Sequence, residues 1–127
     1  MRGTTRRAEN APVIEAAGAE AVVADPDRLA TLVPQVSGAS AVCWLMGSAA
    51  AGSEVHGPRL RSFLETLVDT HVRGFVYEAA GAAGAGAGIV RRAGETYRMP
   101  VEVLEADPGS GDRWLSDAVV AVREVLA

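Results

Sequence analysis

The stretch from Ser40 to Ser48 constrains the fold more than any other part of the chain. Its interior is apolar, carries no charge and does not alternate between apolar and polar residues. A strand that is apolar on both faces is typical of a parallel sheet covered by helices on both sides. Weaker apolar runs recur at 19–24, 74–79 and 101–104, each followed by a helical pattern. We therefore expect an α/β fold with a three-layer, doubly wound parallel sheet and right-handed crossovers.

The helices between these strands are expected at ordinary start and stop signals. Asn10, Asp25 and Asp112 are good N-cap residues, Gly18 is a typical helix end, and Pro34 interrupts a helix. The expected helices cover residues 11–17, 28–33, 58–70, 89–97 and 112–126.

Two of these helices carry apolar residues at helical spacing, which predicts the face that each buries. The helix at 58–70 is expected to bury Leu60, Phe63, Leu64, Leu67 and Val68. The helix at 112–126 is expected to bury Leu115, Ala118, Val119, Val122 and Leu126.

Length and charge set the broad class of the protein. A chain of 127 residues predicts a single domain over 1–127. The net charge of −4 without a basic run argues against nucleic acid as a partner. No window is apolar enough for a membrane span, and no signal peptide is recognised, so we expect a cytoplasmic protein. The lone Cys43 lies mid-strand, where we expect a small buried hydrophobe.

All twelve basic residues are arginines, so the chain contains no lysine. This excludes a phosphate-binding loop lysine, a Schiff-base lysine and a Tyr-x-x-x-Lys pair. Arginine does not replace them in proton transfer, because its pKa stays above about 12. The sequence offers no group of His, Cys and carboxylates at metal-ligand spacing either, so no metal site and no catalytic residue is predicted.

Three segments, in this order and spacing, resemble the short-chain dehydrogenase/reductase superfamily in its extended and atypical branches. Residues 2–7, the following helix and residues 18–25 are similar to the family's second strand, helix and third strand. Residues 39–48 stand where the family has its fourth strand, and 72–77 are similar to its fifth. The resemblance implies a Rossmann-like domain that binds NAD or NADP and is related to reductases and epimerases.

The resemblance also implies cofactor-binding positions at the ends of these strands. Thr5, Arg6 and Arg7 lie at the end of the strand expected at residues 2–7. At this position an arginine of the family binds the 2′-phosphate of NADP, so the resemblance favours NADP over NAD. Asp25 matches an acidic residue beside the adenine, with a plain N-cap as the other interpretation. Gly47 and Ser48 would let a dinucleotide approach the backbone, and a tight turn explains them equally well.

The chain departs from the family where the chemistry is done. The family opens with a strand, a Gly-x-x-Gly-x-x-Gly turn and a helix that hold the pyrophosphate, and this sequence starts after all of them. We therefore expect an N-terminally incomplete domain that binds NADPH weakly or not at all by itself. Ala79 and Ala80 stand where the family usually carries serines. The alternatives are a non-catalytic regulatory or protein-interaction module, and a subunit completed by a partner chain.

Two further features have weaker functional interpretations. The run Gly81–Gly88 between a strand and a helix suggests a phosphate loop, but it lacks the full spacing, and a flexible connection is favoured. His56 lies in the loop after the central strand, on the side of the expected cleft, and a histidine at a helix start is the favoured interpretation.

The last expectation concerns the order of the strands. Without the family's first strand, the sheet order becomes 2-1-3-4-5, which is itself a stable doubly wound arrangement. It requires residues 1–5 to pair beside 40–46. That edge is short and polar, so we expect either a frayed first strand or a gap filled by a neighbouring chain. An exposed central strand would favour self-association into a homo-oligomer.

Overall fold

The computed structural model describes residues 1–50, 52–79 and 85–127. Within them the chain is α/β, with strands and α-helices alternating as predicted. The strands are β1 (Arg2–Thr5), β2 (Glu20–Val23), β3 (Ala41–Trp44), β4 (Gly74–Glu78) and β5 (Val101–Leu104). The α-helices are α1 (Ala11–Ala16), α2 (Leu29–Leu32), α3 (Pro58–Leu67), α4 (Ala85–Tyr97) and α5 (Asp112–Leu126). None of the described helices is long and apolar enough to cross a membrane.

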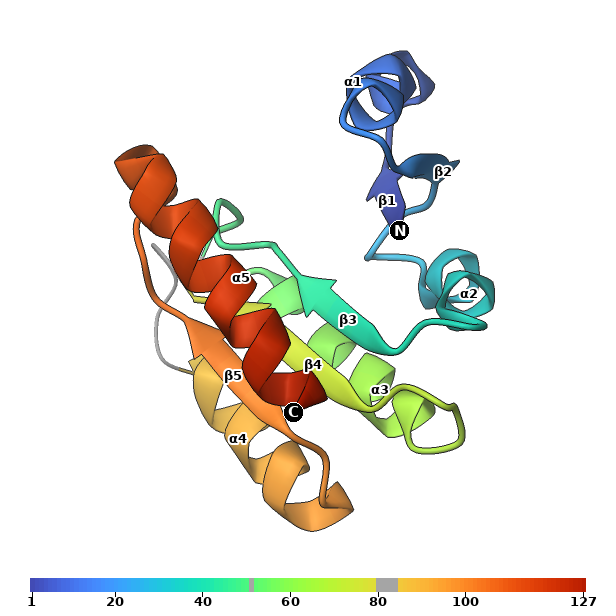
Figure 1. Ribbon diagram of the computed structural model, residues 1–127. Helices are drawn as coiled ribbons and strands as arrows, with labels where there is room; N and C mark the ends of the chain where they lie inside the picture. The colour runs from blue at the N-terminus through green and yellow to red at the C-terminus, as the bar shows by residue number, and fades with distance from the viewer. Residues whose placement is uncertain (51, 80–84) are drawn as a thin grey trace.

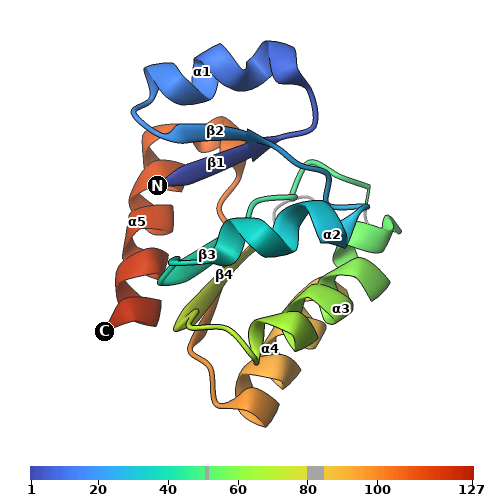
Figure 2. The same cartoon turned by 90° about the vertical axis from the view of Figure 1, so that its right-hand side faces the viewer.

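The strands form two parallel sheets. One contains β1 and β2, and the other has the order β3-β4-β5 (Figure 1). In the part of the chain that the structure describes, β1 does not pair with β3, so the expected continuous sheet is not formed. The strand β1 consists of Arg, Gly and two Thr residues and offers little apolar surface to hold it against β3. Both views place β1, rather than β2, nearer to β3 (Figures 1 and 2).

The buried centre of the larger sheet is β4, whose five residues are all buried. Alternate side chains enter two different clusters. Phe75 and Tyr77 belong to a cluster with residues of α3 and α4, whereas Val76 packs with residues of α5. Helices therefore cover both faces of β4, with α5 on one side and α3 and α4 on the other (Figure 1).

The strand β3 is covered less completely than its sequence predicts. Trp44 is buried against Phe63 and Phe75, with ring centroids 5.0 and 6.5 Å away. Cys43 is exposed, so the expectation of a buried cysteine is wrong. The reason is the position of α5, which lies across β4 and β5 and leaves β3 beside it (Figure 1).

The helix α5 buries part of the predicted face: Ala118, Val122 and Leu126 pack against the core cluster on this side of the sheet. Ala121 and Val125 are buried, whereas Leu115 and Val119 are 58% and 42% exposed. The rotation of α5 is set by its close approach to β4. A Cβ at Gly74 would lie 2.5 Å from Val125 Cβ, so only glycine leaves room for the helix there. The apolar residues of α5 thus spread over a wider part of the helix surface than the sheet covers.

Several predicted helix ends differ from the structure. Asn10 has helical dihedrals and makes no side-chain cap, because a 3₁₀ turn at Ala8–Asn10 leads into α1. Asp112 lies inside α5, and the cap position is Gly111 with φ of 61°. The helix α3 ends at Leu67, so Val68 lies just past it and is exposed. The helix α4 begins at Ala85, four residues earlier than predicted.

Candidate functional site

The six predicted cofactor-binding residues follow the carboxyl ends of three strands. Thr5 ends β1 and lies opposite Val23, and the Ala24 amide donates to the Thr5 carbonyl at 2.9 Å, so β1 and β2 end side by side. In Figure 2, β1 and β2 run toward the side on which the loop after β3 lies. This edge of the two sheets is the candidate site.

The turn after β1 is held by Thr5. Its Oγ1 accepts from the Arg7 amide and donates to the Arg7 carbonyl, each at 3.2 Å. Arg6 and Arg7 are exposed. Among the described residues, neither guanidinium forms an ion pair. Two arginines with free donors at the end of a strand are able to take a phosphate or a carboxylate.

Asp25 shapes the turn after β2 and is not the N-cap of α2. Its Oδ1 accepts from the Asp27 amide at 2.9 Å, and its own amide donates to Thr31 Oγ1 at 2.8 Å. The cap position of α2 is Arg28. Asp25 is thus fixed in place at this edge by local hydrogen bonds, with its carboxylate half-buried.

Gly47 contacts a buried carboxylate that the sequence-based interpretation missed. Glu78, 5% exposed at the end of β4, accepts from the Gly47 amide through Oε1 at 2.8 Å. Its Oε2 accepts from Trp114 Nε1, also at 2.8 Å. A Cβ at Gly47 would lie 2.7 Å from Glu78 Cγ, so the carboxylate itself requires glycine there. Ser48 is exposed beside this bridge. The sequence signal that could have revealed this contact is the charged Glu78 within the otherwise apolar run at 74–79.

A second buried polar pair lies on the other face of β4. His56 and Tyr77 are 2% and 0% exposed, and His56 Nδ1 lies 2.5 Å from the Tyr77 hydroxyl. Burial raises the pKa of Tyr77, so the hydrogen bond joins a protonated phenol to the imidazole, with the donor set by the tautomer of His56. A Cβ at Gly86 would collide with the Tyr77 hydroxyl, which places the first turn of α4 directly on this pair. His56 thus joins the loop after β3 to β4 and faces the interior.

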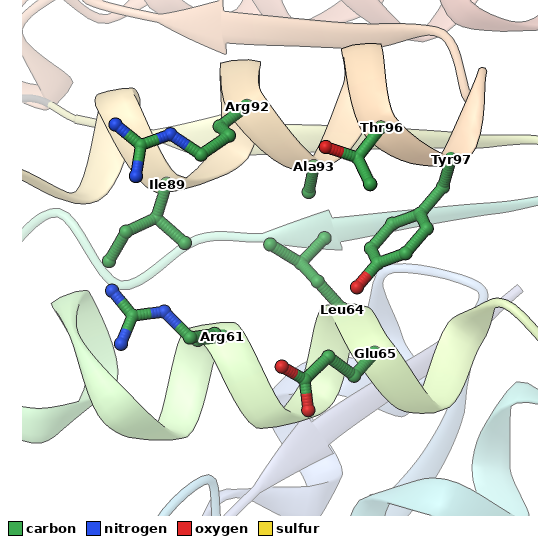
Figure 3. A pocket seen from close by; sticks show the side chains of 8 residues that line it. All are labelled: Arg61, Leu64, Glu65, Ile89, Arg92, Ala93, Thr96 and Tyr97. Carbon is green, nitrogen blue, oxygen red and sulfur yellow. The ribbon is translucent and has the colours of Figure 1, made fainter.

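Two grooves in the part of the chain that the structure describes lie away from the candidate edge. One runs between α3 and α4 (Figure 3) and has a volume of about 140 Å³. Ligand pockets usually measure about 300–1,000 Å³, so this groove is too small for a dinucleotide. A second groove, about 330 Å³, lies at the amino ends of β4 and β5. The lining of the first is Arg61, Leu64, Glu65, Ile89, Arg92, Ala93, Thr96 and Tyr97.

The predictions for the run Gly81–Gly88 and for Ala80 concern a segment that the structure describes only in part. Of the run Gly81–Gly88, residues 85–88 form the first turn of α4. Residues 80–84, with Ala80 and the rest of the proposed connection, lie outside the described residues. Within the described ranges, no three residues among His, Cys, Asp and Glu gather where they could hold a metal ion.

Comparisons with known proteins identify no family for this chain. No protein-family model matches the sequence, and no curated protein matches it.

Proposed function

We propose that the chain is a Rossmann-like domain, related to reductases and epimerases of the short-chain dehydrogenase/reductase superfamily, that binds NADP or NAD without the reductase chemistry. In this proposal the two sheets are halves of one doubly wound arrangement with the order 2-1-3-4-5. In this arrangement the strand order reverses between β1 and β3. On one side β2 lies beyond β1, and on the other side β4 and β5 lie beyond β3. Such a reversal is where open α/β sheets bind ligands, outside the carboxyl ends of their strands.

The observation that carries the proposal is the position of Arg6 and Arg7. They follow β1, the strand on one side of this reversal, and their guanidinium groups are exposed. Arginine binds phosphate through two parallel hydrogen bonds, which suits the 2′-phosphate of NADP. Asp25 follows the neighbouring strand and is held in place next to this position.

Two other features of the chain argue against reductase catalysis. The chain has no lysine for a Tyr-x-x-x-Lys pair, and Tyr77 points into the core toward His56. A phenol that is buried and hydrogen-bonded to a buried imidazole is not available to a substrate at the surface. The proposal is therefore a binding domain and not an oxidoreductase.

Replacing Arg6 and Arg7 together by alanine tests the proposal. We expect weak binding of NADPH to residues 1–127, because within the described residues no glycine-rich turn between a strand and a helix supplies amides to the pyrophosphate. The double variant should weaken NADPH binding about tenfold or more, the loss expected for one or two charge-assisted hydrogen bonds. NADH binding should stay nearly unchanged. NMR titrations with both nucleotides measure the two affinities.

Arg123→Ala is the matched control, because Arg123 is exposed near the other end of the fold, in the last turn of α5. It should leave both affinities unchanged. Equal losses for NADPH and NADH in the double variant would show that Arg6 and Arg7 do not bind the 2′-phosphate. No titration with either nucleotide would favour the alternative, a non-catalytic regulatory or protein-interaction module. The alternative is supported by Glu78, which already fills the space over Gly47.

A further inference from the structure

The groove between α3 and α4 presents two arginines at one of its ends. Arg61 comes from α3 and Arg92 from α4, and both line a space of about 140 Å³. Figure 3 shows their guanidinium groups at the same end of the groove, with Ile89 between them. Glu65 and Tyr97 lie toward the other end. One end of the groove is therefore cationic, and the carboxylate that lines the groove stands away from it.

The two arginines of the groove form no ion pair within the part of the chain that the structure describes. Their neighbours on the same helices do. On α3, Arg59 Nε lies 3.2 Å from a carboxylate oxygen of Glu54. On α4, Arg91 Nη2 lies 3.9 Å from a carboxylate oxygen of Glu105. Each helix thus pairs an arginine beside the groove with a carboxylate and leaves the charge of the arginine in the groove uncompensated.

The direction of the two helices adds to the positive potential at this end. α3 joins β3 to β4 and α4 joins β4 to β5, and these strands are parallel, so the two helices run in the same direction. The cationic end is the one at which both helices begin, since Arg61 precedes Glu65 on α3. Likewise, Arg92 precedes Tyr97 on α4. The amino end of a helix carries a partial positive charge, which favours an anion there.

Between its two ends the groove is apolar. Leu64 and Ala93, which are 1% and 8% exposed, line it together with the half-buried Ile89. The ring of Tyr97, 39% exposed, stands beyond them. A ligand that suits this lining has an anionic group at one end and a small apolar body. The volume of the groove is below that of ordinary ligand pockets, so the ligand is smaller than a nucleotide.

We propose that this groove binds a small organic phosphate monoester. Its phosphate lies between Arg61 and Arg92, because guanidinium groups bind phosphate through paired hydrogen bonds. A phosphate monoester carries nearly two negative charges at neutral pH, which matches two arginines better than a carboxylate does. Its apolar body lies along the side chains between the arginines and Tyr97. The site is separate from Arg6 and Arg7 and does not depend on nucleotide binding at the carboxyl edge.

Phenyl phosphate is a suitable probe, because it joins a phosphate to a small apolar ring. NMR titration of the full chain follows the backbone amides and the Nε signals of the arginines. Saturable shifts should be largest for Arg61 and Arg92. Arg61→Gln and Arg92→Gln should each weaken binding about tenfold, as expected for the loss of a charge-assisted hydrogen bond. Both side chains are exposed, so the variants should stay folded.

Two control variants locate the bound phosphate. Arg91→Gln removes the same charge from α4, but Arg91 faces Glu105 and does not line the groove. It should leave the affinity for phenyl phosphate unchanged. Replacing Arg6 and Arg7 by alanine should leave it unchanged too, so this proposal and the nucleotide proposal can fail independently.

Three results would overturn the proposal. The first is an unchanged affinity for phenyl phosphate in both Arg61→Gln and Arg92→Gln. The second is benzoate binding as tightly as phenyl phosphate, because a carboxylate would then satisfy the site. The third is a dimer, detected by light scattering, in which the signals of the groove change on dilution and not with phenyl phosphate, because a second copy would then fill the groove.

Discussion

Glu78→Ala is expected to lower the free energy of unfolding by about 3–5 kcal/mol. The substitution leaves two donors, the buried Gly47 amide and the half-buried Trp114 Nε1, without their acceptor. Each orphaned donor costs about 1–3 kcal/mol, and the lost side chain adds a cavity. Because β3, β4 and α5 meet at this carboxylate, we expect the loss to affect the whole larger sheet. Urea unfolding monitored by circular dichroism measures it.

Glu78→Gln tests whether both oxygens are needed. The amide keeps one acceptor and turns an NH₂ group toward the second donor, so about 1–3 kcal/mol should still be lost. Glu124→Gln is the matched control, because Glu124 is exposed on α5 and its replacement should stay within about 0.5 kcal/mol. A Glu78→Ala protein as stable as the unaltered chain would contradict the bridge between the two donors.

Two glycines of α4 should respond to alanine with opposite signs. Gly86→Ala places a methyl group on the Tyr77 hydroxyl, where the core has no room. Overpacking of this kind costs about 1–3 kcal/mol, and displacing Tyr77 also breaks its hydrogen bond to His56. The gain in helix propensity, about 1 kcal/mol, does not offset this cost. The free energy of unfolding is therefore expected to fall.

Gly88→Ala is the control for that prediction. Gly88 lies in the same helix, is exposed and has no atom near its missing Cβ. Alanine should raise the free energy of unfolding there by up to about 1 kcal/mol. Stabilisation by both substitutions would show that α4 does not pack on Tyr77 through Gly86.

The alternation of strands and helices could be predicted from sequence because each apolar run has a local signal. The run at 74–79 and the spacing of Leu60, Phe63, Leu64 and Leu67 correctly gave β4 and the buried face of α3. Local signals failed where tertiary packing decides. Ala118, Val122 and Leu126 pack as predicted, whereas Leu115 and Val119 stay exposed because the approach of α5 to Gly74 places Ala121 and Val125 against the sheet.

The candidate site was predictable only where it depends on strand ends. The positions of Arg6, Arg7 and Asp25 follow from where β1 and β2 stop, and the structure places them there. The Glu78 bridge and the His56–Tyr77 pair join residues 31, 36 and 21 positions apart. Periodicity within one element carries no information about such contacts.

Amide hydrogen exchange of the chain alone, resolved by NMR, tests most directly whether the edge of β3 that faces away from β4 is unpaired. Every amide of β4 should be protected, because this strand has a hydrogen-bonded neighbour on each side. In β3, protection should alternate: amides that face β4 are protected, and those that face away from β4 exchange at rates close to those of exposed loops. Uniform protection along β3, equal to that of β4, would contradict an unpaired edge of β3.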